Sequence, residues 1–348
     1  MRTADWDAER AGLATRGAER LRPDVLERLR ACYDAARVDA QLASLARHGD
    51  CIDDADLWLT AALAGNFKFM AIERVDRCPC GSSESLLVSR FVFWNLLGVR
   101  QCSRCGLPFV APRLSPASVE RVFNESYFDH AHPQFWGRRR LPIFRDIVRL
   151  LGRLRCTTIV DVGAAYGHFL HYAARHGIRG VGCDLSRETV EWGRRHLGVD
   201  LRLGRIDQLN LPEGSADAVV CLDTLYYSLQ PVLELQRMRS ALRPGGHVVL
   251  RVRNGRNVAA RARQEASHPI GRAVLPAGHL YGFSPTTIGP TLEAAGFHLL
   301  RCEPAPYSRA VLSPLLQIGF TVNRLARGAY RGIGIVTQSF NVVAKRKD

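Results

Sequence analysis

Short apolar segments alternate with helix-periodic segments through the second half of this 348-residue chain. Five short segments are predicted as strands, at residues 158–162, 180–184, 203–207, 216–222 and 247–252. Between them, residues 166–176 and 231–242 repeat apolar positions every three or four residues, as amphipathic helices do. Parallel strands need crossovers of this kind, so the alternation predicts an α/β fold with a doubly wound sheet.

A glycine-containing turn follows the first predicted strand. Residues 161–167 read DVGAAYG, and glycine in such a turn lets the backbone approach a ligand at the carboxyl end of a strand. Asp184 ends the next strand about twenty residues later, the spacing at which a carboxylate can bind ribose hydroxyls. Strand, turn and acid together predict a nucleotide-binding site.

The order of these motifs resembles that of the class I S-adenosylmethionine-dependent methyltransferases, over roughly residues 157–345. The family's acid-x-Gly-x-Gly-x-Gly turn corresponds to residues 161–167, with Ala165 in place of the middle glycine. Its Pro-Gly-Gly before the fifth strand corresponds to residues 244–246. The resemblance implies a Rossmann-like seven-stranded sheet, with an antiparallel last strand at residues 338–344, and S-adenosylmethionine as the cofactor.

The resemblance also implies which residues hold this cofactor. Asp184 matches the family's ribose-binding acid and Asp207 the acid beside adenine, while Asp223 after the fourth strand is expected to help hold the cofactor. The predicted cofactor-binding residues are Asp161, Gly163, Ala165, Gly167, Asp184, Leu185, Asp207 and Asp223. A nicotinamide dinucleotide is the competing cofactor, but its Gly-x-Gly-x-x-Gly fingerprint fits the spacing from Gly163 to Gly167 poorly.

Two cysteine knuckles, each followed by glycine, precede the sheet. They contain Cys78, Cys80, Cys102 and Cys105, and tetrahedral zinc takes four such thiolates. The zinc would be structural, because four cysteines leave no position for a substrate. Two buried thiol pairs, or a disulfide, are the alternatives. This module is similar to the N-terminal cysteine-rich module of a bacterial group that includes the nucleotide-sugar C-methyltransferases.

The chain is expected to have four parts. They are N-terminal helices at residues 1–76, a small zinc-ribbon-like module at 77–115, a helical linker or lid at 116–156, and the methyltransferase domain at 157–348, which has a basic insert at 254–283 and a helical insert at 307–331. No apolar run is long enough for a transmembrane helix. The ten cysteines without a secretory signal indicate a reducing cytoplasm.

Positive charge is concentrated outside the predicted cofactor sheet. The whole chain carries a formal net charge of +15, yet residues 158–250 contain as many acidic as basic residues. Residues 77–157 and 251–348 carry the excess of arginine and lysine. This pattern predicts an anionic acceptor, such as a phosphorylated or carrier-linked metabolite or RNA. A solvated basic surface with no binding role is the other interpretation.

Methyl transfer requires an aligned acceptor and removal of the acceptor's proton. His279 is the predicted general base because imidazole titrates near neutrality, although a loop histidine can also be purely structural. Tyr227 and Tyr281 are the other predicted catalytic residues.

Three function classes follow from these features. The leading one is a methyltransferase that modifies an oxygen or carbon of an anionic small molecule, in a sugar, glycan or secondary-metabolite pathway. The alternative is an RNA methyltransferase that uses the zinc module for recognition, since basic flanks suit phosphate contacts. The third is a non-catalytic cofactor-binding protein, which the intact set of acids disfavours.

Overall fold

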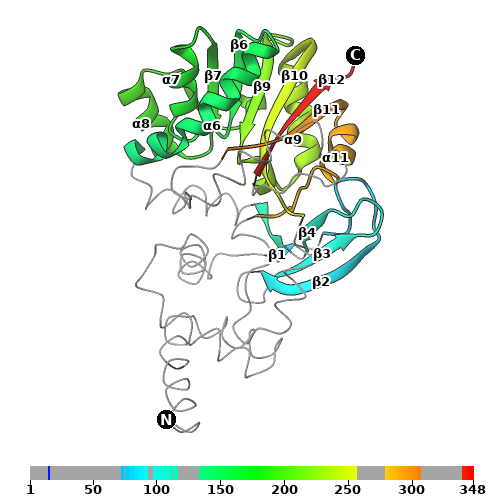
Figure 1. Cartoon of the computed structure of the whole chain (residues 1–348). Helices are drawn as coiled ribbons and strands as arrows, with labels where there is room; N and C mark the ends of the chain where they lie inside the picture. Colours follow the sequence, from blue (N-terminus) through cyan, green and yellow to red (C-terminus); the bar gives the residue numbers. More distant parts are fainter. Residues whose placement is uncertain are drawn as a thin grey trace. The chain divides into compact units, whose positions relative to one another are not determined.

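The computed structural model describes residues 72–73, 75–92, 97–111, 113–116, 133–256, 279–306 and 339–348, together with Thr15. The predicted helices before residue 72, most of the basic insert and the helical insert at 307–331 lie outside these residues. The chain divides into two compact units, drawn in Figure 1. The first comprises Met1–Tyr127 and Gly255–Gly282, and the second Phe128–Asn254 and Phe283–Asp348.

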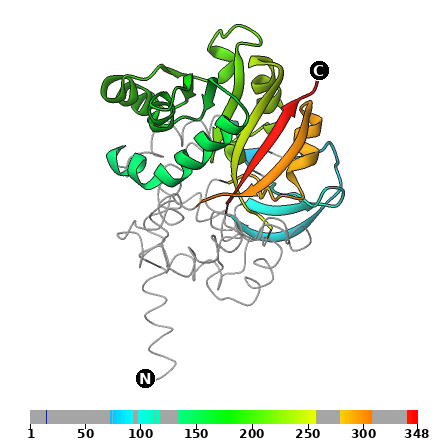
Figure 2. The same cartoon turned by 45° about the horizontal axis from the view of Figure 1, so that its top comes forward.

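The second unit is built on a seven-stranded sheet. Its strands are β6 (Thr158–Val162), β7 (Arg179–Asp184), β8 (Leu201–Leu203), β9 (Ala216–Leu222), β10 (Leu242–Arg253), β11 (Phe297–Pro304) and β12 (Ser339–Arg346). They are ordered β11-β12-β10-β9-β6-β7-β8. Strands β6 to β10 are parallel, whereas β12 runs antiparallel between β10 and β11, as Figure 2 shows. The predicted doubly wound sheet with an antiparallel last strand is confirmed.

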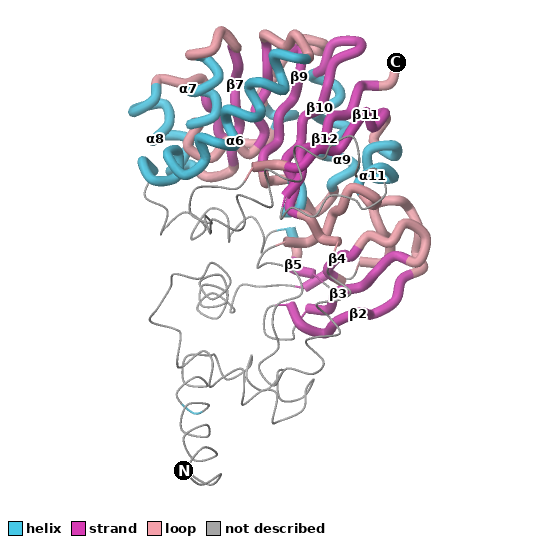
Figure 3. Tube along the Cα trace, viewed as in Figure 1, coloured by secondary structure: helices cyan, strands magenta, loops and turns pink. Residues whose placement is uncertain are grey.

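Helices cover both faces of this sheet, as seen in Figures 1 and 3. Helices α6 (Pro133–Arg153), α7 (His168–Ala174) and α8 (Arg187–Leu197) lie on one face, and α9 (Pro231–Ala241) and α11 (Ile288–Ala294) lie on the other. Helix α8 has strong end signals: the Ser186 hydroxyl accepts a hydrogen bond from the Thr189 amide, and Gly198 ends the helix in a left-handed conformation.

Helix α6 contributes directly to the core of the second unit. It lies in the segment expected as a linker or lid, and its residues Ile147, Leu150 and Leu151 are almost fully buried. They pack in one cluster with Phe169 of α7 and Val220 of β9. Burial of each such side chain stabilises the fold by about 1.5–3 kcal/mol, so α6 is a structural part of the sheet unit.

Glycine accounts for two of the element boundaries that differ from the prediction. The third strand covers Leu201–Leu203 rather than 203–207, because Gly204 has a φ of 121° and the chain then forms the 3-10 turn η2 (Ile206–Gln208). Helix α7 begins at His168 rather than at residue 166, because Gly167 adopts a left-handed conformation.

The first unit contains the cysteine module. Strands β2 (Ser85–Val92), β3 (Leu97–Cys102) and β4 (Pro108–Val110) form an antiparallel sheet, and β1 (Ile72–Glu73) pairs with β5 (Arg113–Leu114). The stretch 280–282, at the end of the predicted insert, lies along β4. The Val110 amide donates to the Leu280 carbonyl, and the Gly282 amide donates to the Pro108 carbonyl. This sheet is therefore extended by a segment about 170 residues away in sequence.

In the part of the chain that the structure describes, no helix combines the length and apolar character needed to span a membrane.

Candidate cofactor site and cysteine cluster

The turn after β6 is tightly constrained. Gly163, Ala165 and Gly167 all have positive φ, at 70°, 49° and 75°. The amides of Gly163 and Ala164 donate to the Cys183 carbonyl at 2.9 and 3.0 Å, which holds the turn against β7. A Cβ atom on Gly163 would lie 2.3 Å from Thr224 Oγ1, so only glycine fits there. Ala165 carries the left-handed strain of about 1–2 kcal/mol that glycine would avoid.

The Asp184 carboxylate joins this turn to helix α8. Its Oδ2 accepts a hydrogen bond from the Ala165 amide at 2.8 Å, and its Oδ1 accepts one from the Ser186 amide at 2.9 Å. Burial raises the pKa of Asp184, and these amides oppose that rise. Each carboxylate oxygen has two lone pairs, so both retain capacity to accept from ligand hydroxyls.

Asp161 is the most buried acid of the predicted cofactor set, with 2% of its surface exposed. Burial and the neighbouring Asp184 charge raise its pKa from 3.8 to about 7, while Arg140 acts in the opposite direction. Its folded-state pKa therefore lies above its unfolded one. The bound proton stabilises the cofactor-free fold at acid pH, and this contribution is lost as the pH rises towards 7.

Asp223 is held between two arginines. It follows β9 with a φ of 61°, and its carboxylate forms ion pairs with Arg140 of α6 and Arg251 of β10. Burial would raise the pKa of Asp223, but the two guanidinium groups outweigh burial and lower it. Neither arginine was singled out in the sequence. Arg251 did carry a signal, because it interrupts the apolar pattern of a central strand.

Three further predicted residues of the second unit make different contacts. Asp207 lies in η2, and its partly exposed carboxylate pairs with Arg237 Nε at 3.1 Å. Leu185 is partly exposed between Asp184 and Ser186. Tyr227 lies in the 3-10 turn η3 (Leu225–Tyr227), with its ring 4.7 Å from that of Tyr226.

His279 and Tyr281 belong to the first unit, whereas Tyr227 belongs to the second. Both His279 and Tyr281 are 4% exposed. Arg113 Nη1 donates to the Tyr281 hydroxyl at 3.0 Å, and Arg113 is itself buried. Sequence reasoning missed Arg113, since nothing in the local pattern links it to a tyrosine 168 residues away.

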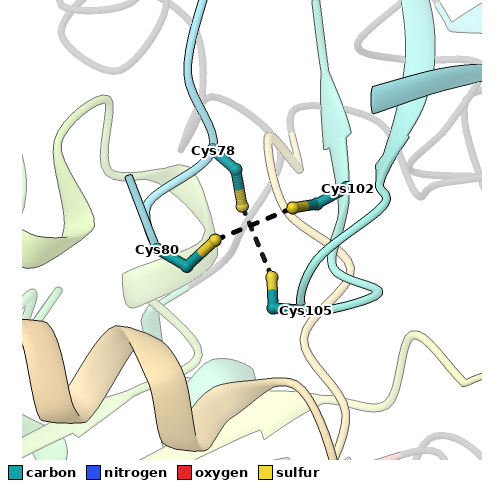
Figure 4. Close-up of side chains that lie close together, drawn as sticks. All are labelled: Cys78, Cys80, Cys102 and Cys105. Atoms are coloured by element: carbon teal, nitrogen blue, oxygen red, sulfur yellow. Dashed lines mark hydrogen bonds between the residues drawn. The ribbon is translucent and has the colours of Figure 1, made fainter. Parts of the chain in front are cut away.

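The four knuckle cysteines of the first unit form a compact cluster, shown in Figure 4. The Sγ atoms of Cys78 and Cys105 are 3.5 Å apart, those of Cys80 and Cys102 are 3.7 Å apart, and all four lie within 4.8 Å of one another. Tetrahedral zinc, with Zn–S bonds of about 2.3 Å, places its sulfur ligands about 3.8 Å apart. A disulfide needs an S–S separation of about 2 Å, so the cluster has the spacing of a metal site and not that of disulfides.

Comparison with known proteins gives a match that lies mostly in the second unit. Residues 135–301 match the family model described as a methyltransferase domain. Ubiquinone biosynthesis O-methyltransferase of Xanthomonas campestris pv. campestris (strain B100) is 27% identical over 166 residues, covering 45% of this chain and 70% of that protein. The chain contains an S-adenosylmethionine-dependent methyltransferase domain.

Solved structures of other methyltransferases are similar to the chain as well. The S-adenosylmethionine-dependent methyltransferases of Archaeoglobus fulgidus and Mesorhizobium loti are 18% and 20% identical to it, with TM-scores of 0.42 and 0.43. Each covers 61% of this chain, and the matches include 96% and 100% of the respective structures.

Substituting the first turn glycine of the methyltransferase domain tests how closely the turn is packed. Gly163→Ala should lower the free energy of unfolding by about 3 kcal/mol, from left-handed strain plus the collision with Thr224. Gly177→Ala is the matched control, because Gly177 has a φ of 77° but open space around it. It should lose only about 1 kcal/mol. Urea unfolding measures both, and equal losses would contradict the packing argument.

Proposed function

We propose that this protein transfers a methyl group from S-adenosylmethionine to an oxygen of an anionic small molecule in a biosynthetic pathway. The observation that carries the choice of oxygen is the match to ubiquinone biosynthesis O-methyltransferases. The family resemblance of the sequence motifs also leaves carbon open as the acceptor atom. The basic residues outside 158–250 support an anionic acceptor.

The described residues fit the proposed cofactor. When bound, S-adenosylmethionine supplies an electrophilic methyl group on a positively charged sulfur. We assign Asp184 to the ribose hydroxyls because both its oxygens are fixed by backbone amides. We assign Asp161 to the positive charge of the cofactor, since a buried acid near another acid is stabilised in its ionised form by a cation.

On the acceptor side, we propose that His279 takes the proton of the acceptor hydroxyl. It lies in the same short stretch as Tyr281, whose hydroxyl is positioned by buried Arg113. This stretch is hydrogen-bonded to β4 of the cysteine module. Contacts that hold β4 in place therefore also help to position His279.

We propose that Cys78, Cys80, Cys102 and Cys105 hold one structural zinc ion. The sulfur separations of 3.5 and 3.7 Å support this assignment, and four thiolates close the coordination shell. The knuckle at Cys102 leads through Leu107 into β4, because the Cys102 amide donates to the Leu107 carbonyl at 3.0 Å. The metal would thus fix the strand along which residues 280–282 lie. Cysteines that bind a metal instead of forming disulfides suit a reducing cytoplasm.

The acceptor class can be tested with cofactor that carries a labelled methyl group. The protein is incubated with this cofactor and with an extract of its host, and the products are separated into small molecules, RNA and protein. We expect label in an anionic small molecule, in a linkage that resists mild acid as an ether does. Label in a nuclease-sensitive fraction would contradict this proposal and favour the RNA alternative.

Cofactor affinity should depend on pH through Asp161. Because its pKa is about 7 without ligand, binding a cation beside it requires loss of a proton below that pH. The affinity for S-adenosylhomocysteine, whose ammonium group is shared with the cofactor, should therefore rise about tenfold from pH 6 to pH 8. Asp161→Asn should bind more weakly at pH 8 and lose this rise. Calorimetry at several pH values measures it.

The control for this experiment is Glu213→Gln, which removes an exposed carboxylate of the same unit. It should keep the pH dependence of the unchanged protein. An Asp161→Asn protein with the same slope would show that another group titrates, and would remove Asp161 from the cofactor site.

Elemental analysis should find about one zinc per chain. Cys102→Ser should lose most of the metal, whereas Cys302→Ser should keep it, because Cys302 is a free thiol outside the cluster. Metal loss should reduce methyl transfer while leaving S-adenosylhomocysteine affinity unchanged, since the cofactor residues lie in the other unit. A fully active, metal-free protein would exclude the zinc assignment.

A further inference from the structure

Three guanidinium groups and one carboxylate gather at the carboxyl ends of β9 and β10. Asp223 follows β9, Arg251 and Arg253 end β10, and Arg140 comes from α6. Arg140 and Arg251 form ion pairs with Asp223, and the charge of Arg253 helps to lower the pKa of this carboxyl. Asp223 balances only one of these three positive charges, and Arg140 also interacts with buried Asp161.

Two of these arginines bind the carboxylate, one at each oxygen. Its Oδ1 accepts from Arg251 and its Oδ2 from Arg140. Arg251 also donates from Nη2 to the Pro306 carbonyl at 3.1 Å, but its buried Nε has no hydrogen-bond partner among the described residues. Arg251 is 6% exposed, so its charge has little contact with water. A second anion beside this buried charge would stabilise it.

Arg253 differs from the other two arginines in being exposed. Among the residues that the structure describes, no carboxylate pairs with it. Arg140 has partial exposure, with 16% of its side chain accessible, and lies over the Trp136 ring at 4.9 Å. The cluster therefore has a buried, fixed part at Arg251 and an accessible part at Arg140 and Arg253.

Asp223 itself is held in an unusual backbone conformation. Its φ of 61° is in the left-handed region, and its amide donates to the Arg251 carbonyl at 2.8 Å. Strain of this kind persists where the surroundings fix it, and it is concentrated at functional sites. The next residue, Thr224, touches the cofactor turn: its Oγ1 lies 3.5 Å from the Gly163 carbonyl, to which it donates. The arginine cluster is thus one residue away from that turn.

We propose that Arg140, Arg251 and Arg253 form the subsite that binds the anionic group, a carboxylate or phosphate, of the methyl acceptor. Asp223 acts as the internal counter-ion that orients two of the arginines. Ligands of doubly wound sheets bind at the carboxyl ends of the strands, which is where this cluster lies. The inference rests on the proposed methyl transfer to an anionic acceptor and assigns particular residues to the anion.

The test uses inorganic phosphate as the probe, with the metal-loaded full-length protein saturated with S-adenosylhomocysteine. Phosphorus NMR line broadening measures phosphate binding, and calorimetry measures S-adenosylhomocysteine affinity. Arg253→Gln should weaken phosphate binding about tenfold, because one charged hydrogen-bond donor is lost. Its S-adenosylhomocysteine affinity and its thermal unfolding should not change, since this side chain is exposed.

Arg187→Gln is the matched control, because Arg187 is exposed and, among the described residues, forms an ion pair only with Glu191, a surface contact at 3.8 Å. It should bind phosphate as the unchanged protein does. Equal phosphate binding in all three proteins would overturn the subsite.

A loss of S-adenosylhomocysteine affinity in Arg253→Gln, with phosphate binding retained, would assign the anion to the carboxylate of the cofactor and would also overturn it. Failure of the unchanged protein to bind S-adenosylhomocysteine would instead refute the proposed function, so the two failures are distinguishable.

Discussion

The hydrogen bonds of the Asp184 carboxylate are the constraint on which the rest of the second unit's site depends. One oxygen holds the Ala165 amide in the turn after β6, and the other holds the Ser186 amide at the start of α8. These two contacts join neighbouring strand-to-helix connections at a single group. They also keep a negative charge close to Asp161, whose pKa is raised to about 7 by its burial first and by the Asp184 charge second. The group that fixes the turn therefore also contributes to the acidity of Asp161.

The sequence predicts the architecture well because that architecture depends on local patterns. The strands β6, β7 and β9, the stop after α9 and the antiparallel β12 all follow from apolar runs, glycines and the family resemblance. The boundary of β8 was wrong because a single glycine, Gly204, ends the strand earlier than the apolar pattern does. The four knuckle cysteines were found for the same reason, since their spacing is local.

Contacts between distant residues were beyond local patterns. The pairing of Asp223 with Arg140 joins residues 83 positions apart, and the bond from Arg113 to Tyr281 spans 168 positions. Likewise, the periodicity of α6 predicts an apolar face but does not identify the surface against which this face packs. Charged residues in apolar strands, such as Arg251, are the one local signal of such pairings, because a buried charge requires a partner.

The charges of the second unit are separated along the edge of the sheet. Buried Asp161 and partly buried Asp184 lie at β6 and β7. Arg140 of α6 and Arg251 and Arg253 of β10, which flank the neutral stretch 158–250 in sequence, gather around Asp223 after β9. Acids near the turn suit a positively charged cofactor, and arginines suit a negatively charged acceptor. A uniform basic surface would attract an anion equally to every part of the edge. Under the proposed function, separated charges favour one orientation, in which the cofactor lies near the acids and the acceptor near the arginines.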